Sequence, residues 1–117
     1  MSPKRGDRVA PPPRRDEWDV LFADNDSAKG WEELCGQAPG NTFEAWHSMR
    51  TDPVPRLPVP RHHPLKGKLS HEVRGGRLLP KWQIEVTGGG RVWYFVDAER
   101  RTVWLVWAGT GHPKATE

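Results

Sequence analysis

The chain has 117 residues, of which 28% are charged and 35% hydrophobic, and its formal net charge is +3 at pH 7. This length is enough for one domain. The single cysteine, Cys35, excludes an intramolecular disulfide and any zinc site built on paired cysteines. No apolar run approaches the about 20 residues of a membrane span, and the N-terminus lacks the apolar core of a signal peptide. We therefore expect a cytoplasmic protein with no membrane contact.

The charge is distributed unevenly along the chain. Residues 17–52 carry eight acidic and two basic side chains, whereas residues 53–116 carry eleven basic and four acidic ones. An acidic half beside a basic half suggests that the second half binds a polyanion. The alternative is that both halves are ordinary solvated surfaces.

The first 16 residues differ in composition from the rest of the chain. They contain five basic residues and four prolines and show no apolar periodicity. We therefore expect residues 1–16 to be a flexible basic arm, dispensable for folding but able to strengthen polyanion binding. Residues 17–117 would then form a single domain.

The first half of this domain has the pattern of a strand followed by two helices. Weak alternation over residues 17–22 predicts a short strand. Apolar residues at helical spacing predict one helix over residues 27–37 and a second from about residue 41 to residue 50. The short link between the two helices favours an αα-hairpin. Five prolines in residues 53–64 then require an extended crossing.

The second half has the pattern of an antiparallel meander. Residues 68–80 are polar and contain Gly75 and Gly76, which is typical of a loop or a small hairpin. Three runs rich in Val, Ile and aromatic residues follow, at 81–87, 91–97 and 102–108. The predicted order is β-α-α-β-β-β, an α+β fold whose antiparallel, twisted sheet packs on the helix hairpin.

Alternation gives the two faces of the meander different characters. If the first hairpin loop has three residues, Glu85 opposes Trp93 and Thr87 opposes Arg91. The apolar face should be the core that meets the helices, and it comprises Trp82, Ile84, Val86, Val92, Tyr94 and Val96. The other face should line an open, partly apolar groove, and it carries Lys81, Gln83, Glu85 and Arg91 together with aromatic residues.

Four short pieces of the chain carry a resemblance to a known family. They are Leu65–Gly67, the strand Trp82–Val86, the strand start Gly90–Tyr94, and Gly111–Lys114 with its Gly-His-Pro-Lys sequence. In order and spacing they resemble the RelE/ParE superfamily of bacterial type II toxins, over about residues 17–115. The resemblance implies a RelE-like fold, no cofactor, and a cognate antitoxin as partner.

The superfamily contains two kinds of activity, and the fold alone does not choose between them. Members of the RelE and YoeB branches cleave messenger RNA in the ribosomal A site without a metal, whereas ParE members poison DNA gyrase. We expect the first activity, an mRNA interferase that inhibits translation with mRNA and the ribosome as partners. The alternatives are a non-enzymatic, ParE-like gyrase poison and a degenerate member that retains only nucleic-acid or antitoxin binding.

Metal-free RNA cleavage needs a base, an acid, cations near the phosphate and surfaces that hold the bases. The resemblance implies that Arg91 grips the scissile phosphate and that His112 acts as general acid or base. It also implies phosphate contacts for Lys66 and Lys114. Two further candidates for RNA binding come from the predicted groove face, where Lys81 is a cation and Trp93 could stack a base or belong to the core.

The general base has two candidates, and at both the sequence departs from the family pattern. His63 occupies the position of a glutamate in YoeB-like members, and Glu85 occupies the position of a lysine in RelE. We expect His63 to serve the chemistry and Glu85 to orient Arg91. The chain's histidines lack the spacing of a zinc site, so no metal is expected.

Overall fold

The computed structural model describes residues 2–110, and it has an α+β fold in which two helices pack on a six-stranded sheet. The elements are β1 (Asp19–Phe22), α1 (Asn25–Gln37), α2 (Pro39–Thr51), β2 (His62–Pro64), a 3-10 helix (Gly67–Leu69), β3 (His71–Arg74), β4 (Arg77–Glu85), β5 (Gly90–Asp97) and β6 (Thr102–Thr110). The predicted helix pair and the three meander strands are confirmed. The polar stretch before the meander is a hairpin, since Gly75 and Gly76 have φ of 60° and 78° and join β3 to β4.

The sheet is mixed, so the expectation of a fully antiparallel sheet is wrong at one edge. The strand order is β1-β6-β5-β4-β2, and β3 pairs with the first half of β4. The meander strands are antiparallel, whereas β1 runs parallel to β6, with Asp19 opposite Thr102. Short hairpins force antiparallel neighbours, but β1 and β6 are far apart in sequence and escape that constraint.

The pairing of β4 with β5 differs from the predicted register by two residues. Glu85 opposes Arg91, and not Trp93 as expected. Pairing of Glu85 with Arg91 leaves residues 86–90 to close the hairpin, more than the three residues expected. Within this turn the carbonyl of Gly90 accepts from the amides of both Val86 and Thr87, at 2.8 and 3.1 Å. A shift of two residues preserves the face to which every side chain points, so the assignment of the two faces is unaffected.

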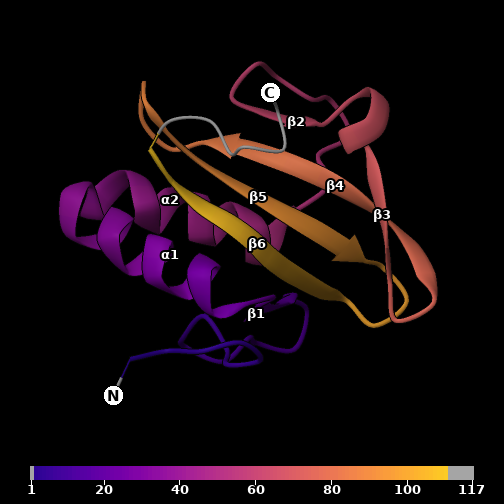
Figure 1. Cartoon of the computed structure of the whole chain (residues 1–117), viewed down its shortest axis with the longest axis horizontal. Coiled ribbons are helices and arrows are strands. Elements are labelled where there is room, and N and C mark those ends of the chain that lie inside the picture. Colours follow the sequence, from indigo (N-terminus) through magenta and orange to yellow (C-terminus); the bar gives the residue numbers. More distant parts are fainter. Residues whose placement is uncertain (1, 111–117) are drawn as a thin grey trace.

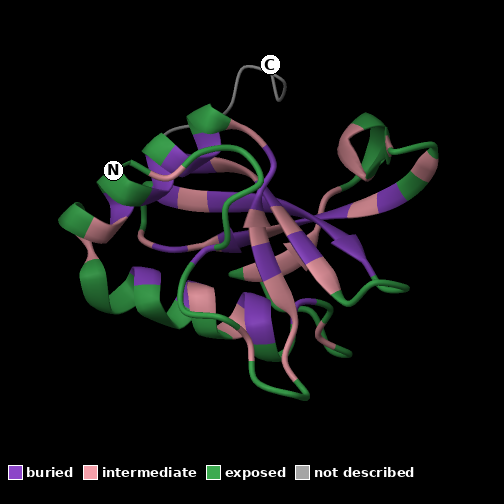
Figure 2. Ribbon diagram, turned by 90° about the horizontal axis from the view of Figure 1, so that it is seen from below, coloured by how far each residue is buried: buried purple, intermediate pink, exposed green. Residues whose placement is uncertain are grey.

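The helices cover one face of the sheet, here called the inner face (Figure 1). The predicted core residues of β4 and β5 all lie there, together with Phe22, Leu34, Met49 and Leu105. Burial is concentrated along the central strands and on the helix stripe that faces them, while loop tips and outer helix turns are exposed (Figure 2). The apolar alternation of the strands therefore positions the core as expected.

Helix α1 lies unusually close to β6. Asp24 begins the helix with a capping box, accepting from the amide of Ser27 at 2.7 Å while the Ser27 hydroxyl faces the Asp24 backbone. One turn later, the α-carbon of Gly30 faces the backbone of Ala108. A β-carbon at residue 30 would lie 1.9 Å from the carbonyl oxygen of Ala108, so only glycine permits this approach.

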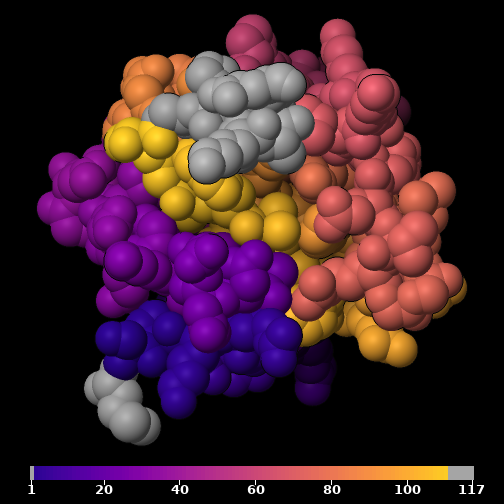
Figure 3. Space-filling model, viewed as in Figure 1, coloured from indigo at the N-terminus to yellow at the C-terminus, as the bar shows by residue number. Residues whose placement is uncertain are grey.

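The N-terminal segment is packed, unlike the flexible arm expected from its composition. The amide of Gly6 donates to Phe22 at 2.8 Å, and the amide of Val9 donates to Val20 at 2.7 Å, so the segment runs along the free edge of β1. Val9 is buried in the core. In Figure 3 the indigo N-terminal residues lie directly against α1. One apolar side chain among prolines and arginines carries no periodicity, and therefore the sequence pattern missed this contact.

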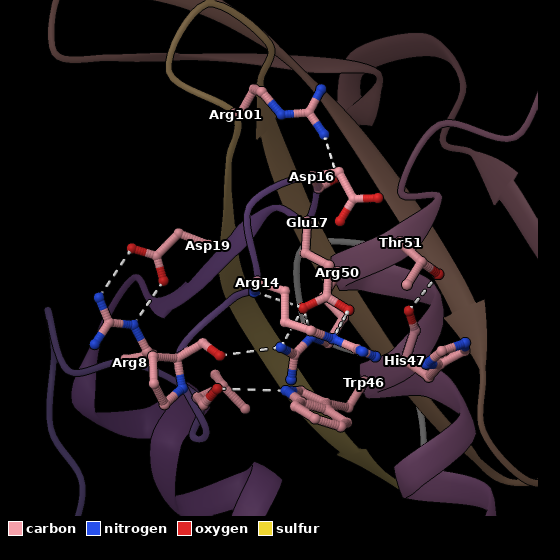
Figure 4. A network of polar contacts seen from close by, with 12 residues as sticks. Arg8, Arg14, Asp16, Glu17, Asp19, Trp46, His47, Arg50, Thr51 and Arg101 are labelled. Atoms are coloured by element: carbon pink, nitrogen blue, oxygen red, sulfur yellow. Dashed lines mark hydrogen bonds and ion pairs between the residues drawn. The ribbon is translucent and has the colours of Figure 1, made fainter.

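A buried ion pair fixes the junction between this segment and α2 (Figure 4). The Arg50 guanidinium lies 2.5 Å from the Glu17 carboxylate and donates to the carbonyl of Pro12 at 3.1 Å. The Arg50 guanidinium also stacks 4.2 Å from the ring centre of Trp46. Hydrogen bonds from the Arg14 amide and from Arg50 lower the pKa of Glu17.

The proline-rich crossing is tied to the inner face by the hydroxyl of Tyr94. This hydroxyl donates to the carbonyl of Pro53 at 2.6 Å and accepts from Nε2 of His62 at 2.5 Å. Burial raises the pKa of Tyr94 well above its ordinary value and lowers the pKa of His62. The Tyr94 hydroxyl, as donor to one partner and acceptor from the other, therefore joins the crossing to the inner face.

Candidate active site

The sheet face that points away from the helices, here called the outer face, gathers most of the candidate residues. Strand pairing aligns His63 of β2 with Gln83 of β4, Gln83 with Trp93 of β5, and Trp93 with Trp107 of β6. Because register partners on a sheet lie side by side and point the same way, these four side chains form one row across the sheet. The row contains an imidazole, an amide and two indoles.

Two hydrogen bonds run along this row, and a third joins its His63 end to the backbone. Nε1 of Trp93 donates to Oε1 of Gln83 at 2.7 Å. Nε2 of Gln83 lies 3.4 Å from Nε2 of His63. Nδ1 of His63 lies 3.0 Å from the carbonyl oxygen of its neighbour Pro64. The imidazole of His63 is therefore contacted through both of its ring nitrogens.

Glu85 and Arg91 occupy the adjacent row. They are register partners on β4 and β5, and both side chains are half-buried. The Nε atom of Arg91 is buried. This adjacency suits the expected role of Glu85 in orienting Arg91. On the same face, Glu85 lies one row from His63 on the neighbouring strand, and Arg91 lies one strand farther from His63.

Lys81 lies on the outer face but is not the free surface cation that the sequence suggested. It is buried, and its ammonium lies 3.6 Å from the carboxylate of Glu72 in β3. The ammonium is also 5.3 Å from the ring centre of Trp93 and 5.1 Å from that of Phe95. The β3–β4 hairpin brings Glu72 to this position, so contact between Lys81 and a phosphate requires the carboxylate to move.

Trp93 is also buried, with only 3% of its surface exposed. Its ring lies under Lys81 and 6.5 Å from the ring of Trp107, and its Nε1 is bonded to Gln83. Stacking of an RNA base on Trp93 therefore has no exposed ring face available. The other possibility given above, that Trp93 belongs to the core, agrees with its burial, although Trp93 lies on the outer face and outside the core cluster of the inner face.

Lys66 approaches the row from the loop that follows β2. With His63 it lines an open hollow of about 450 Å³, whose other walls are Pro64 and residues 58–60 of the proline-rich crossing. Lys66 is exposed, so its ammonium is free to meet a phosphate held near His63.

Two candidates, His112 and Lys114, lie outside the described residues. Within residues 2–110 no cluster of three or more His, Cys, Asp or Glu side chains has the geometry of a metal site. The described candidates supply an imidazole, a guanidinium, an exposed ammonium and a carboxylate. Such a set can move a proton and neutralise a phosphate.

Sequence reasoning placed Gln83 on the correct face but gave it no role. Its importance comes from the pairing of His63 with Gln83, and β2 is only three residues long and was not expected as a strand. The alternating pattern of β4 did indicate that Gln83 and Trp93 share a face. The missing signal was the partner strand at the other edge.

No family model matches the chain, and no curated protein or solved structure matches it. In the described part of the chain, no helix is long and apolar enough to cross a membrane.

Proposed function

We propose that the protein is a metal-independent endoribonuclease, the RelE-like toxin of a type II toxin–antitoxin system, which cleaves mRNA on the ribosome. The observation that carries the proposal is that His63, Glu85 and Arg91 share the outer face, with Lys66 at its border. These are the groups that transfer of a phosphoryl group to a ribose hydroxyl requires.

The proposed reaction is an internal transfer within the RNA. Nε2 of His63 accepts the proton of the 2′-hydroxyl, and the 2′-oxygen forms a bond to phosphorus. The bond between phosphorus and the 5′-oxygen breaks, and the leaving oxygen receives a proton from His112. The products are a 2′,3′-cyclic phosphate and a 5′-hydroxyl. Arg91 and Lys66 neutralise the charge that grows on the phosphate.

Two features of the molecule support this assignment of roles. Arg91 and Glu85 share a row, so the carboxylate can hold the guanidinium in one orientation for a two-point grip on phosphate. His63 and Lys66 line one open hollow, so a phosphodiester entering there meets a base and a cation together. Recognition of a cognate antitoxin is part of the proposal, since a free ribonuclease of this kind would damage its host.

The test is cleavage of mRNA by translating ribosomes supplied with the purified full-length protein. We expect cuts with cyclic-phosphate ends for the wild type and a loss of about 100-fold for Arg91→Lys, because lysine lacks the planar fork. Arg56→Lys is the matched control, since Arg56 is exposed on the proline-rich crossing. It should cleave like the wild type.

Two outcomes would contradict the proposal. If the wild type arrests growth while all transcripts stay uncut, the protein is a binding poison, and gyrase inhibition becomes the next assay. If the wild type neither cuts RNA nor arrests growth, a degenerate member remains. Equal cleavage by Arg91→Lys and wild type would remove Arg91 from the reaction.

A further inference from the structure

We propose that Gln83 and Trp93 are positioning residues that hold His63 in one tautomer, with the proton on Nδ1 and the lone pair of Nε2 on the outer face. This inference deepens the proposed function, because it rests on His63 as the base. Its physical content, the tautomer of one imidazole, is independent of any activity.

The first step is the orientation of the Gln83 amide. The indole Nε1 of Trp93 can only donate, and it lies 2.7 Å from Oε1 of Gln83. The oxygen of the amide must therefore face Trp93, and the amide nitrogen must face the other way. Because Trp93 is buried, the indole is held by packing and serves as a fixed anchor.

The second step is the state of the imidazole. The amide nitrogen of Gln83 only donates, and it faces Nε2 of His63 at 3.4 Å. A carbonyl oxygen only accepts, and that of Pro64 faces Nδ1 of His63 at 3.0 Å. Both contacts are satisfied when Nδ1 carries the proton and Nε2 carries the lone pair. In the opposite tautomer, the Nε2 proton of His63 would face the amide protons of Gln83, and the Nδ1 lone pair would face the carbonyl oxygen of Pro64.

The consequence concerns how the base is presented. The contact between Gln83 and His63 is long, so the amide holds the imidazole weakly, and a ribose hydroxyl can take its place at Nε2. The Nδ1 proton stays on the Pro64 carbonyl, which steadies the ring while Nε2 accepts the substrate proton. A general base needs a lone pair that the substrate hydroxyl can reach in this way. The buried Trp93 would thus orient the Gln83 amide and would not stack a base.

The test reads the tautomer directly. In protein with isotope-labelled histidine, long-range proton–nitrogen NMR spectra in alkaline buffer distinguish the two neutral forms, and the His63 signal is assigned by its loss in His63→Asn. We expect the Nδ1–H form to dominate in the wild type. Gln83→Glu should invert the tautomer, because a carboxylate accepts from both Trp93 and His63 and donates to neither.

A second pair of variants separates the indole anchor from general loosening. Trp93→Phe frees the amide to turn, so the ratio of the tautomers should move by about fivefold toward the Nε2–H form, as expected for loss of one hydrogen bond. Trp107→Phe is the matched control, since it makes the same change in the next side chain of the row. It should leave the ratio unchanged.

The same variants make a kinetic prediction. Gln83→Leu should lower kcat about tenfold with KM unchanged, and it should cost nothing further in a His63→Ala background, because the two residues act as a unit. Dominance of the Nε2–H form in the wild type would overturn the inference, as would no inversion in Gln83→Glu or an equal effect of Trp107→Phe. If the tautomers behave as expected but RNA is never cut, the positioning stands and the nuclease proposal fails.

Discussion

The inner and outer faces of the sheet are built from the same strands by the same alternation, yet their side chains differ in chemistry. On the inner face the core side chains of the strands are apolar except Tyr94, whose hydroxyl donates to the carbonyl of Pro53 and contacts Nε2 of His62. On the outer face indoles are layered with charged and amide groups, and Lys81 is held between Glu72 and two rings. The difference lies in what covers each face, since the inner one meets two helices and the outer one meets the β3–β4 hairpin and solvent.

A buried side chain on this sheet therefore does not always belong to the apolar core. Trp93 on the outer face is as buried as Val96 on the inner face, but it carries a polar contact to Gln83 that an apolar layer would lack. We therefore expect changes on the inner face to act on stability, and changes on the outer face to act on chemistry.

The sharpest contrast is expected from His63→Ala on the outer face. Loss of a general base typically costs about 100-fold or more in rate, so cleavage of RNA should fall by at least that factor. The free energy of unfolding should change by less than about 1 kcal/mol, because His63 is only half-buried. Rates come from single-turnover assays and stability from urea unfolding. His71→Ala, at an exposed histidine in β3, is the control, and an equal loss of rate there would break the contrast.

On the inner face the largest effect should come from Gly30→Ala. The new methyl group would meet the backbone of Ala108, which cannot move without separating α1 from β6. We expect a loss of about 3 kcal/mol or more in the free energy of unfolding, measured with urea. In the same helix, a β-carbon added at Gly36 would meet no atom within 4 Å, so Gly36→Ala should raise the free energy of unfolding by about 0.5–1 kcal/mol. Similar values for the two variants would contradict the close approach.

Tyr94→Phe removes the polar link between the inner face and the proline-rich crossing. The carbonyl of Pro53 and the ring nitrogen of His62 would lose a buried partner, at a cost of about 1–3 kcal/mol. Hydrogen exchange should report faster opening of β2, which contains His62. If the free energy of unfolding and the exchange in β2 were both unchanged, a water molecule would have replaced the hydroxyl.

Val9→Ala tests whether the N-terminal segment belongs to the core. The side chain is 4% exposed, so its truncation should lower the free energy of unfolding by about 1–2 kcal/mol. Val73→Ala, at an exposed valine of β3, should change it by less than about 0.5 kcal/mol. If both variants matched the wild type, the segment would be the dispensable arm that its composition indicates.

The smallest effect is a pH dependence caused by His62. Its pKa is lowered by burial from the ordinary value of 6.5, so below that pH the unfolded chain binds a proton that the folded protein refuses. Stability should therefore be highest above pH 6.5 and fall on acidification until the folded pKa is reached, with a slope of at most about 1.4 kcal/mol per pH unit. Urea unfolding at several pH values measures the slope. His62→Gln should flatten it, and an unchanged slope would assign it to other groups.

The parts of the fold that sequence could predict are those set by local pattern. Helical spacing around Trp31 and Leu34 and the alternation of β4 and β5 gave the helix pair, the strands and both faces of the meander. The predicted register of β4 with β5 was wrong because a glycine-rich turn permits several loop lengths. The loop length observed has the hydrogen bonds to the carbonyl of Gly90. The packing of the N-terminal segment was not predicted, because a single apolar residue, Val9, gives no periodic pattern.

The candidate site was predictable in its membership more than in its arrangement. His63, Glu85 and Arg91 share the outer face because of strand pairing, and Lys66 reaches His63 from the loop after β2. The alternation of β4 and β5 anticipates the positions of Glu85 and Arg91. The burial of Lys81 and Trp93 depends on how the β3–β4 hairpin curls, which no local pattern records. The role of Gln83 follows from donor and acceptor geometry across three strands, and only the assembled sheet displays it.

The parallel pairing of β1 with β6 has a consequence for biosynthesis. During translation β1, α1 and α2 leave the ribosomal exit tunnel long before their neighbouring strand has been made, and the edge of β1 has no sheet to join. Native contacts of this kind, distant along the chain, form late and slow the closing step. The sheet is completed only when β6 has been made, and only then do Trp107 and Gly109 lie opposite Trp93 and Arg91.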